Sequence, residues 1–332
     1  MLIEPCQHTE EMKLAGALLI VYVVWGSTFL AIAVADRTLP PFLMLSLRFL
    51  LAGGVLYAWA RRRGAGVPTL RQWGAASVVG GALLVVDTGG VAWAEQRIPS
   101  GLVALLVASV PLFIALIDRA CFGIRLPLGA AAGIAVGLFG VSLLVGGGGH
   151  IDLVGAAVVL VASFAWAAGS AYARVASLPG DTFLSAAMQM LTAGIALGVV
   201  AVASGEHVRH VSAESLGAFA FLVVFGSLIA FTAYGWLIRN APSPLASTYA
   251  YVNPAVAVFL GWLLVGEHVG AREITAGLVI LSSVALLAIR HDRRSAPEPV
   301  AEALQPYIRR QEARRSEFRG APRLSELPRL AA

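Results

Sequence analysis

Two charged residues interrupt long apolar stretches of this sequence. Arg48 lies eight residues after Pro40, and Asp87 lies eight residues before Glu95. A charged side chain inside a membrane span costs about 2.5–3.5 kcal/mol on insertion scales, so each such residue is a candidate for a functional role. Eight helical residues rise about 12 Å, which puts both charges at one depth on consecutive antiparallel helices. We predict an ion pair beside a substrate path, with Asp87 as the candidate for proton coupling; a pair that only orients helices is the alternative.

Two prolines fall near the middle of apolar stretches, at Pro111 and Pro254. A proline inside a helix frees a carbonyl oxygen in the preceding turn and kinks the helix. Matching interruptions in two halves of a chain point to a binding site at the membrane midplane. We therefore predict helix breaks at both prolines, with the amide of Asn253 beside them. A kink needed only for packing is the alternative.

Aromatic and polar side chains recur on the other apolar stretches. Two tryptophans facing one cavity, Trp25 and Trp166, would suit an amphipathic or aromatic organic solute. For each aromatic residue alone, packing against lipid or helices is the alternative. The predicted cavity residues are Trp25, Thr28, Arg48, Asp87, Trp166, Gln189, Tyr234, Tyr249 and Asn253.

The chain contains an internal repeat. The segment WAEQRIPSGLVALLVASVP at 93–111 aligns without a gap with WLIRNAPSPLASTYAYVNP at 236–254, sharing Trp, Pro, Ser and Pro. A second set of matches pairs Trp25 with Trp166 and Arg48 with Gln189. Residues 14–146 are thus repeated as 153–289, with a period too long for a solenoid, which indicates a duplicated half.

The composition excludes a soluble fold. Hydrophobic residues make up 58% of the chain, charged residues 13%, and the mean hydropathy is +0.80, whereas soluble domains carry about 25% charged residues. The net charge of +5 comes with no nucleic-acid-reading motif, so we expect no nucleic acid partner. Cys6 and Cys121 form neither a disulfide framework nor a zinc site. Phosphate-loop, protease, hydrolase and kinase motifs are absent from the sequence, so we expect no cofactor, no metal and no catalytic residues.

We predict an all-α integral membrane protein of ten spans, since about 20 apolar residues cross a bilayer core and lipid-exposed backbone must satisfy its own hydrogen bonds. The spans are 14–35, 40–60, 73–94, 101–118, 128–146, 153–173, 182–204, 216–238, 246–265 and 273–289. Twelve Lys and Arg near span ends fall on the side of the N-terminus, against Arg37, Arg97, Arg209 and Arg272 on the other. This bias places both termini in the cytoplasm. Five spans per half then make the two halves inverted repeats, as in secondary transporters.

Two other features bear on partners. Residues 290–332 are rich in arginine, acids and proline, which predicts a disordered cytoplasmic tail. Glycines recur every fourth residue at 129, 133 and 137, and again at Gly194 and Gly198. Small residues at this spacing let helices approach closely, within the bundle or, alternatively, in a homodimer.

Several motifs resemble the EamA-type permeases of the drug/metabolite transporter superfamily. They are WGSTFLAI at 25–32, RFLLAGG at 48–54, AEQRIPSGLVALLVASVPLF at 94–113, SFAWAAGS at 163–170 and YAYVNPAVAVFLG at 249–261 with GE at 266–267. Through IPSG at 98–101 and LIRN at 237–240 the chain is most similar to the YedA-type drug/metabolite exporters. The resemblance implies two five-helix EamA repeats in a bacterial inner membrane, a central cavity lined by both, and efflux of amino acids, metabolites or drugs.

We therefore expect a secondary transporter that exports a small organic molecule by alternating access. A membrane-embedded enzyme is one alternative, but it would need a cluster of acids or histidines, and the span interiors hold one acid and no histidine. A structural or sensory membrane protein without flux is the other.

Overall fold

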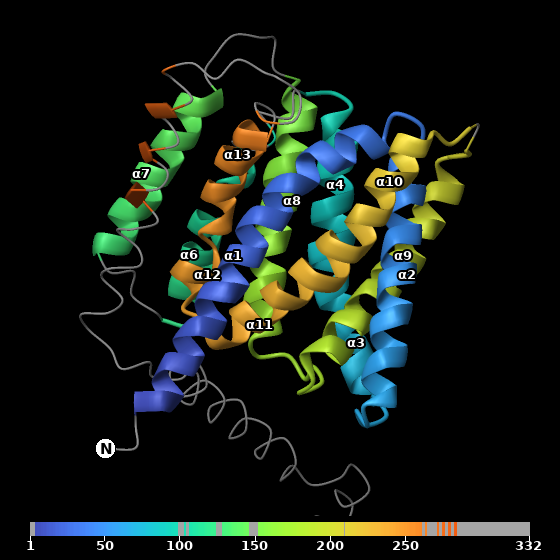
Figure 1. The fold of residues 1–332 in the computed structure, drawn as a ribbon, viewed down its shortest axis with the longest axis horizontal. Coiled ribbons are helices and arrows are strands. Elements are labelled where there is room, and N and C mark those ends of the chain that lie inside the picture. The colour runs from blue at the N-terminus through green and yellow to red at the C-terminus, as the bar shows by residue number, and fades with distance from the viewer. Residues whose placement is uncertain are drawn as a thin grey trace, which may run out of the picture. The chain divides into compact units, whose positions relative to one another are not determined.

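The computed structural model describes residues 4–98, 103, 106–123, 128–145, 152–208 and 210–260, and scattered residues from 263 to 283. Every regular element in this part of the chain is a helix (Figure 1). The first repeat contributes α1 (Glu4–Ala35), α2 (Pro41–Arg62), α3 (Leu70–Gly80), η1 (Gly81–Thr88), α4 (Gly89–Glu95), α6 (Val110–Cys121) and α7 (Leu128–Val145). The second contributes α8 (Leu153–Ala173), α9 (Thr182–Ala203), α10 (Ala213–Phe221), η2 (Leu222–Phe231), α11 (Thr232–Asn240), α12 (Ser243–Ala246) and α13 (Tyr249–Leu260).

Six helical stretches of the described chain are long and apolar enough to cross a membrane. They are Glu11–Ile32, Pro41–Arg62, Leu70–Glu95, Leu153–Ala173, Thr182–Ala203 and Ala213–Asn240. The predicted spans at 101–118, 128–146, 246–265 and 273–289 each include residues outside the described part, and the predicted tail at 290–332 lies wholly outside it.

Local sequence explains where these helices begin and end. Pro41 occupies the first turn of α2, where an N–H would have no acceptor within the helix, and two arginines in the last turn complement the helix dipole. Helix α3 begins with a capping box, in which Gln72 N donates to Thr69 Oγ1 over 3.3 Å and Thr69 N donates to Gln72 Oε1 over 2.8 Å. Aspartates cap α8 and α9 in the same position.

Helices α2 and α9 join the two repeats through close backbone contact. A Cβ on Gly53 would lie 3.0 Å from the carbonyl oxygen of Ala187, and one on Gly194 would lie 2.8 Å from Leu50 Cγ. A Cβ on Gly198 would meet Ser46 Oγ at 2.9 Å. The two glycines that the sequence pairs at a four-residue spacing therefore face α2 within the bundle.

Hydrogen bonds between neighbouring elements define two ends of the bundle. At the end that we call the Asp36 end, α1 ends and α2 begins, and the Glu206 carboxylate accepts from the N–H of Leu43 over 2.7 Å. At the opposite end, called the Arg174 end, α2 finishes and Arg239 Nη1 donates to the carbonyl oxygen of Pro179 over 3.1 Å. Of the described basic residues that set the predicted orientation, all but Arg37 and Arg97 lie at the Arg174 end.

Two segments of the bundle are π-helical rather than α-helical. They are η1 in the first repeat and η2 in the second, and repeat offsets of 141 to 143 align them. At the end of η1, the Thr88 hydroxyl donates to the carbonyl oxygen of Leu83, five residues back, over 3.0 Å. Such segments are rare and often occur at functional sites. The hydrophobic pattern did not predict them, because a single widened turn barely changes the apolar period.

Candidate functional site

A cavity of about 120 Å³ lies inside the bundle, between helices of both repeats. Its lining runs from the aromatic rings near the middle of the helices to Ile32 and Val91, close to the Asp36 end. The lining residues are Trp25, Thr28, Ile32, Arg48, Phe49, Leu84, Asp87, Thr88, Val91, Val107, Val110, Trp166, Gly226, Ser227, Phe231, Tyr249 and Asn253.

Four aromatic rings form the wall of the cavity that faces the Arg174 end. The ring of Trp25 lies 5.5 Å from that of Trp166 and 5.1 Å from those of Tyr234 and Tyr249, measured between centroids. Hydrogen bonds fix both indoles, since Trp25 Nε1 donates to the Gly226 carbonyl over 3.2 Å and Trp166 Nε1 donates to the Tyr234 hydroxyl over 2.9 Å. The cavity therefore offers a rigid aromatic surface built from both repeats.

Arg48 and Asp87 both face this cavity but do not form the predicted ion pair. Arg48 Nε instead donates to Ser227 Oγ over 2.7 Å. Equal depth along the two helices was not sufficient to pair the charges. The η2 segment places the Ser227 hydroxyl beside the Arg48 guanidinium, and the sequence pattern did not reveal this neighbour. Within the described chain no hydrogen bond or ion pair is formed by the Asp87 carboxyl group. The cavity thus presents a positive and a negative group separately.

The remaining predicted residues divide into two groups. Thr28 and Asn253 line the cavity, with Thr28 Oγ1 donating to the Trp25 carbonyl over 2.6 Å. Tyr234 is the one ring of the aromatic wall that does not itself line the cavity, and it is 1% exposed. Gln189 does not reach the cavity, because its carbonyl packs on Gly80 and its amide nitrogen donates to Ser185 over 3.1 Å. The repeat mate of Arg48 therefore has a different environment, and the site is asymmetric.

The two prolines are also placed differently from each other. Pro111 lies in the first turn of α6, directly after a turn at 108–109, so it begins a helix and does not kink a continuous one. Pro254 lies inside α13, and the turn in that segment comes earlier, at 247–248. Both segments are interrupted near the aromatic wall, but the second interruption does not coincide with its proline.

Sequence reasoning missed four polar or aromatic lining residues, Phe49, Thr88, Ser227 and Phe231. Phe49 belongs to α2, and the other three belong to the π-helical segments. Ser227 could have been found as a hydroxyl within a wholly apolar stretch, whereas Phe231 has no such signal.

The chain matches the family model described as "EamA-like transporter family" twice, over residues 13–146 and 153–289. This chain belongs to the EamA-like transporter family. The match covers both repeats that line the cavity, so this EamA protein is a multi-pass membrane transporter of the drug/metabolite transporter superfamily.

Relatives of this EamA protein include bacterial inner-membrane proteins. It is 39% identical over 297 residues to the "Uncharacterized inner membrane transporter YedA" of Escherichia coli (strain K12), covering 89% of this chain and 96% of that one. It is 24% identical to the "Probable terminal-alkyne amino-acid exporter" of Streptantibioticus cattleyicolor, covering 86% and 98%. It is 22% identical to the "Probable amino-acid metabolite efflux pump" of Salmonella typhimurium (strain LT2), covering 80% and 91%. The location is accordingly the inner membrane.

A solved crystal structure has the same fold. Its chain superposes with a TM-score of 0.73 at 22% sequence identity, over 86% of this EamA protein and 99% of that chain.

Proposed function

We propose that this transporter exports a small amphipathic organic solute, such as an amino acid or a related metabolite or drug, by alternating access. The observation that carries the proposal is the cavity in which Arg48 and Asp87 face the same space without pairing. A buried charge is costly unless it is paired. A solute with one anionic and one cationic group would supply both missing partners.

The aromatic wall supports an apolar portion on the same solute. Rings that present faces and edges within 5.1 to 5.5 Å of Trp25 leave little freedom to rearrange. A cation over such faces gains about 0.5–2 kcal/mol, and an apolar side chain gains by leaving water. The names of two relatives, an amino-acid exporter and an amino-acid metabolite efflux pump, fit the same solute chemistry.

The remaining parts of the proposal concern the membrane. Ten spans form two inverted five-helix repeats with both termini in the cytoplasm, so the Arg174 end is the cytoplasmic one. Asp87 exchanges a proton for the solute, which makes export responsive to the pH gradient. The cavity lining that extends toward the Asp36 end supports an outward-facing state.

Flux into and out of proteoliposomes tests the proposal. Purified protein would be reconstituted with pooled labelled amino acids and cationic dyes, with and without a pH gradient. Asp87→Asn keeps the shape of the side chain and removes its charge. Charge-assisted hydrogen bonds contribute about 1.5–3 kcal/mol, so KM for a solute that binds Asp87 should rise roughly 10- to 150-fold.

Asp152→Asn is the matched control. Asp152 caps α8 outside the cavity, accepting from Val154 N over 2.8 Å, and asparagine caps a helix as well as aspartate does. Saturable flux that Asp87→Asn weakens and Asp152→Asn leaves unchanged supports the proposal. Flux with the same KM and the same pH dependence in Asp87→Asn would show that this carboxyl group takes no part.

A further inference from the structure

The side chains on the cytoplasmic side of the aromatic wall are arranged in layers. On α6, Val110 lines the cavity, and on α8 Trp166 does so. One helical turn further, Ile114 and Ser170 line a separate pocket of about 20 Å³ that shares no lining residue with the cavity. That pocket has room for about one water molecule.

The third layer is an ion pair. Asp118, one more turn along α6, binds Arg174, which caps the C-terminus of α8 one turn beyond Ser170. Residues four and eight positions apart lie on one helix face. The three layers therefore follow a single line between the two helices, from the cavity to the Arg174 end.

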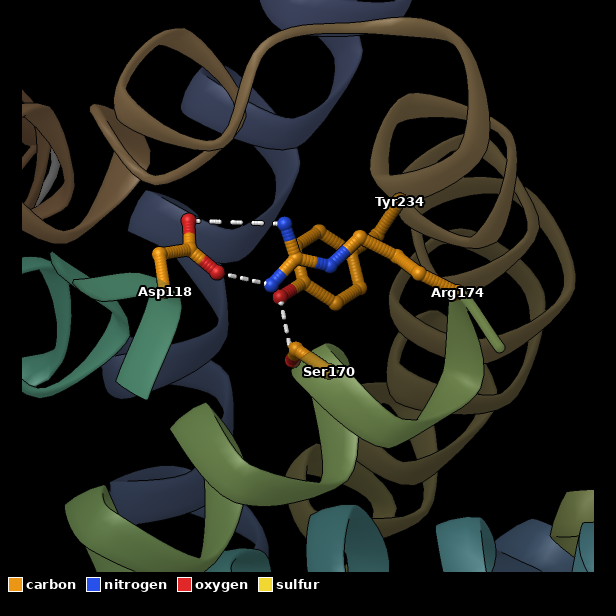
Figure 2. Close-up of polar contacts among 4 residues, drawn as sticks. All are labelled: Asp118, Ser170, Arg174 and Tyr234. Carbon is orange, nitrogen blue, oxygen red and sulfur yellow. Dashed lines mark hydrogen bonds and ion pairs between the residues drawn. The ribbon is translucent and has the colours of Figure 1, made fainter. Parts of the chain in front are cut away.

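Both ends of this line are tightly held (Figure 2). Two guanidinium nitrogens of Arg174 contact the two carboxylate oxygens of Asp118, one of them at 3.4 Å, and the side chains are 6% and 8% exposed. Bidentate pairs of this kind are the strongest and most directional side-chain contacts. The Tyr234 hydroxyl lies 2.8 Å from Ser170 Oγ and also accepts from Trp166, so its ring fills the space between cavity and pocket.

The ion pair also links the two repeats. Asp118 belongs to the first family match and Arg174 to the second. Arg239 is a second, partly buried arginine at this end. Its guanidinium donates instead to Pro179, Gly180 and Ser185, all within the second repeat. A motion of one repeat against the other must break the first set of contacts and can keep the second.

We propose that Tyr234 and the Asp118–Arg174 pair form the cytoplasmic gate of a solute path that runs between α6 and α8. The inference rests on the proposed function, because a gate requires a transported solute. In the state described here the gate is closed. The Tyr234 ring separates the cavity from the small pocket, and the ion pair holds α6 and the end of α8 together. Opening toward the cytoplasm separates Asp118 from Arg174 and moves Tyr234 out of the line.

Cysteine labelling from the cytoplasmic side tests the gate without any solute. Ala171, which lines the small pocket and is 3% exposed, would be changed to cysteine in a protein whose Cys6 and Cys121 are serine. Inside-out membrane vesicles would then be treated with a membrane-impermeant maleimide. We expect slow labelling in this parent and a rate at least about tenfold higher in Asp118→Asn and in Arg174→Gln, equivalent to about 1.4 kcal/mol.

Two further variants separate gating from general loosening. The charge-swapped double variant Asp118→Arg, Arg174→Asp should return the rate toward the parent value. Arg239→Gln removes hydrogen bonds at the same end within one repeat and should leave the rate unchanged. If Asp118→Asn fails to insert, Arg174→Lys keeps the charge but loses the bidentate fork, and should raise the rate about threefold.

Three results would overturn the gate. They are parent-like rates in the single variants, an equal rise in Arg239→Gln, and a double variant as fast as the single ones. Failure of the proposed function is distinguishable. A parent that labels as expected but carries no solute in proteoliposomes refutes the transport proposal, and the gate with it, while the labelling rates still show that the ion pair limits access from this end. If the parent transports solute while Asp118→Asn is labelled as slowly as the parent, only the gate proposal is refuted.

Discussion

Replacing Gly80 with alanine tests the contact that positions the π-helical segment carrying Asp87. Gly80 is the last residue of α3 and directly precedes η1. A Cβ at this position would lie 2.4 Å from the carbonyl oxygen of Gln189 on α9, and 3.0 Å from its carbonyl carbon and its Cα. All three atoms are backbone, so no side-chain rotation can relieve the overlap.

The size of the effect follows from these distances. The backbones must separate by about 0.6 Å before the nearest contact reaches 3.0 Å. Overpacking of this kind costs about 1–3 kcal/mol, and the higher helix propensity of alanine offsets up to about 1 kcal/mol of it. At about 2–4 °C per kcal/mol, we expect Tm to fall by several degrees and solute flux to fall as Asp87 moves.

Gly81→Ala is the matched control, one residue further along. Its φ of −59° and ψ of −45° are in the right-handed helical region that alanine adopts readily, and no neighbouring atom lies within 4 Å of the added Cβ. Alanine there should leave Tm unchanged or raise it slightly. Thermal unfolding in detergent, followed by tryptophan fluorescence, compares the two variants with the parent. Equal Tm values for Gly80→Ala and Gly81→Ala would refute the close approach of α3 to α9.

Three further predictions follow from single contacts. Tyr234→Phe removes both hydrogen bonds of a buried hydroxyl and should lower the free energy of unfolding by about 1–3 kcal/mol, measured by denaturation in detergent. Ser227→Ala deprives the Arg48 guanidinium of its hydrogen bond, worth about 1.5–3 kcal/mol, and should change KM roughly tenfold in proteoliposomes without changing the amount of inserted protein. Burial and then the neighbouring Glu206 carboxylate raise the pKa of Asp36 to about 7. Protonated Asp36 therefore stabilises the fold fully below about pH 3.8, and this contribution is lost as the pH rises through about 7; Asp36→Asn should flatten that fall in Tm.

Several site residues could be found from the sequence because their types are unusual where they occur. A charge such as Arg48 or Asp87 inside an apolar stretch is visible without any structure, since the cost of burying it makes it rare. The repeat pairing of Trp25 with Trp166 pointed to a shared aromatic surface, and the two rings do lie edge to face. Seven of the nine residues predicted for the cavity line it.

What the sequence did not predict depends on which side chains each helix turns toward its neighbours. Gln189 occupies the position that matches Arg48, yet α9 turns it toward Ser185 on its own helix. Asp118 and Arg174 are 56 residues apart in the chain, and their contact exists only because α6 and α8 run side by side with their ends in register.

The sequence by itself determined that the chain is helical, lies in a membrane, is duplicated and belongs to its family. These properties follow from composition and from the order of residues along the chain, because a bilayer imposes the same length and polarity on every span. Only the tertiary structure decided that Arg48 bonds Ser227 and not Asp87, and that Asp118 of α6 forms an ion pair with Arg174 at the end of α8. Such pairings depend on distances between side chains of different helices. A small rotation of one helix about its axis changes which side chains meet, but it leaves the hydropathy of the sequence unaltered.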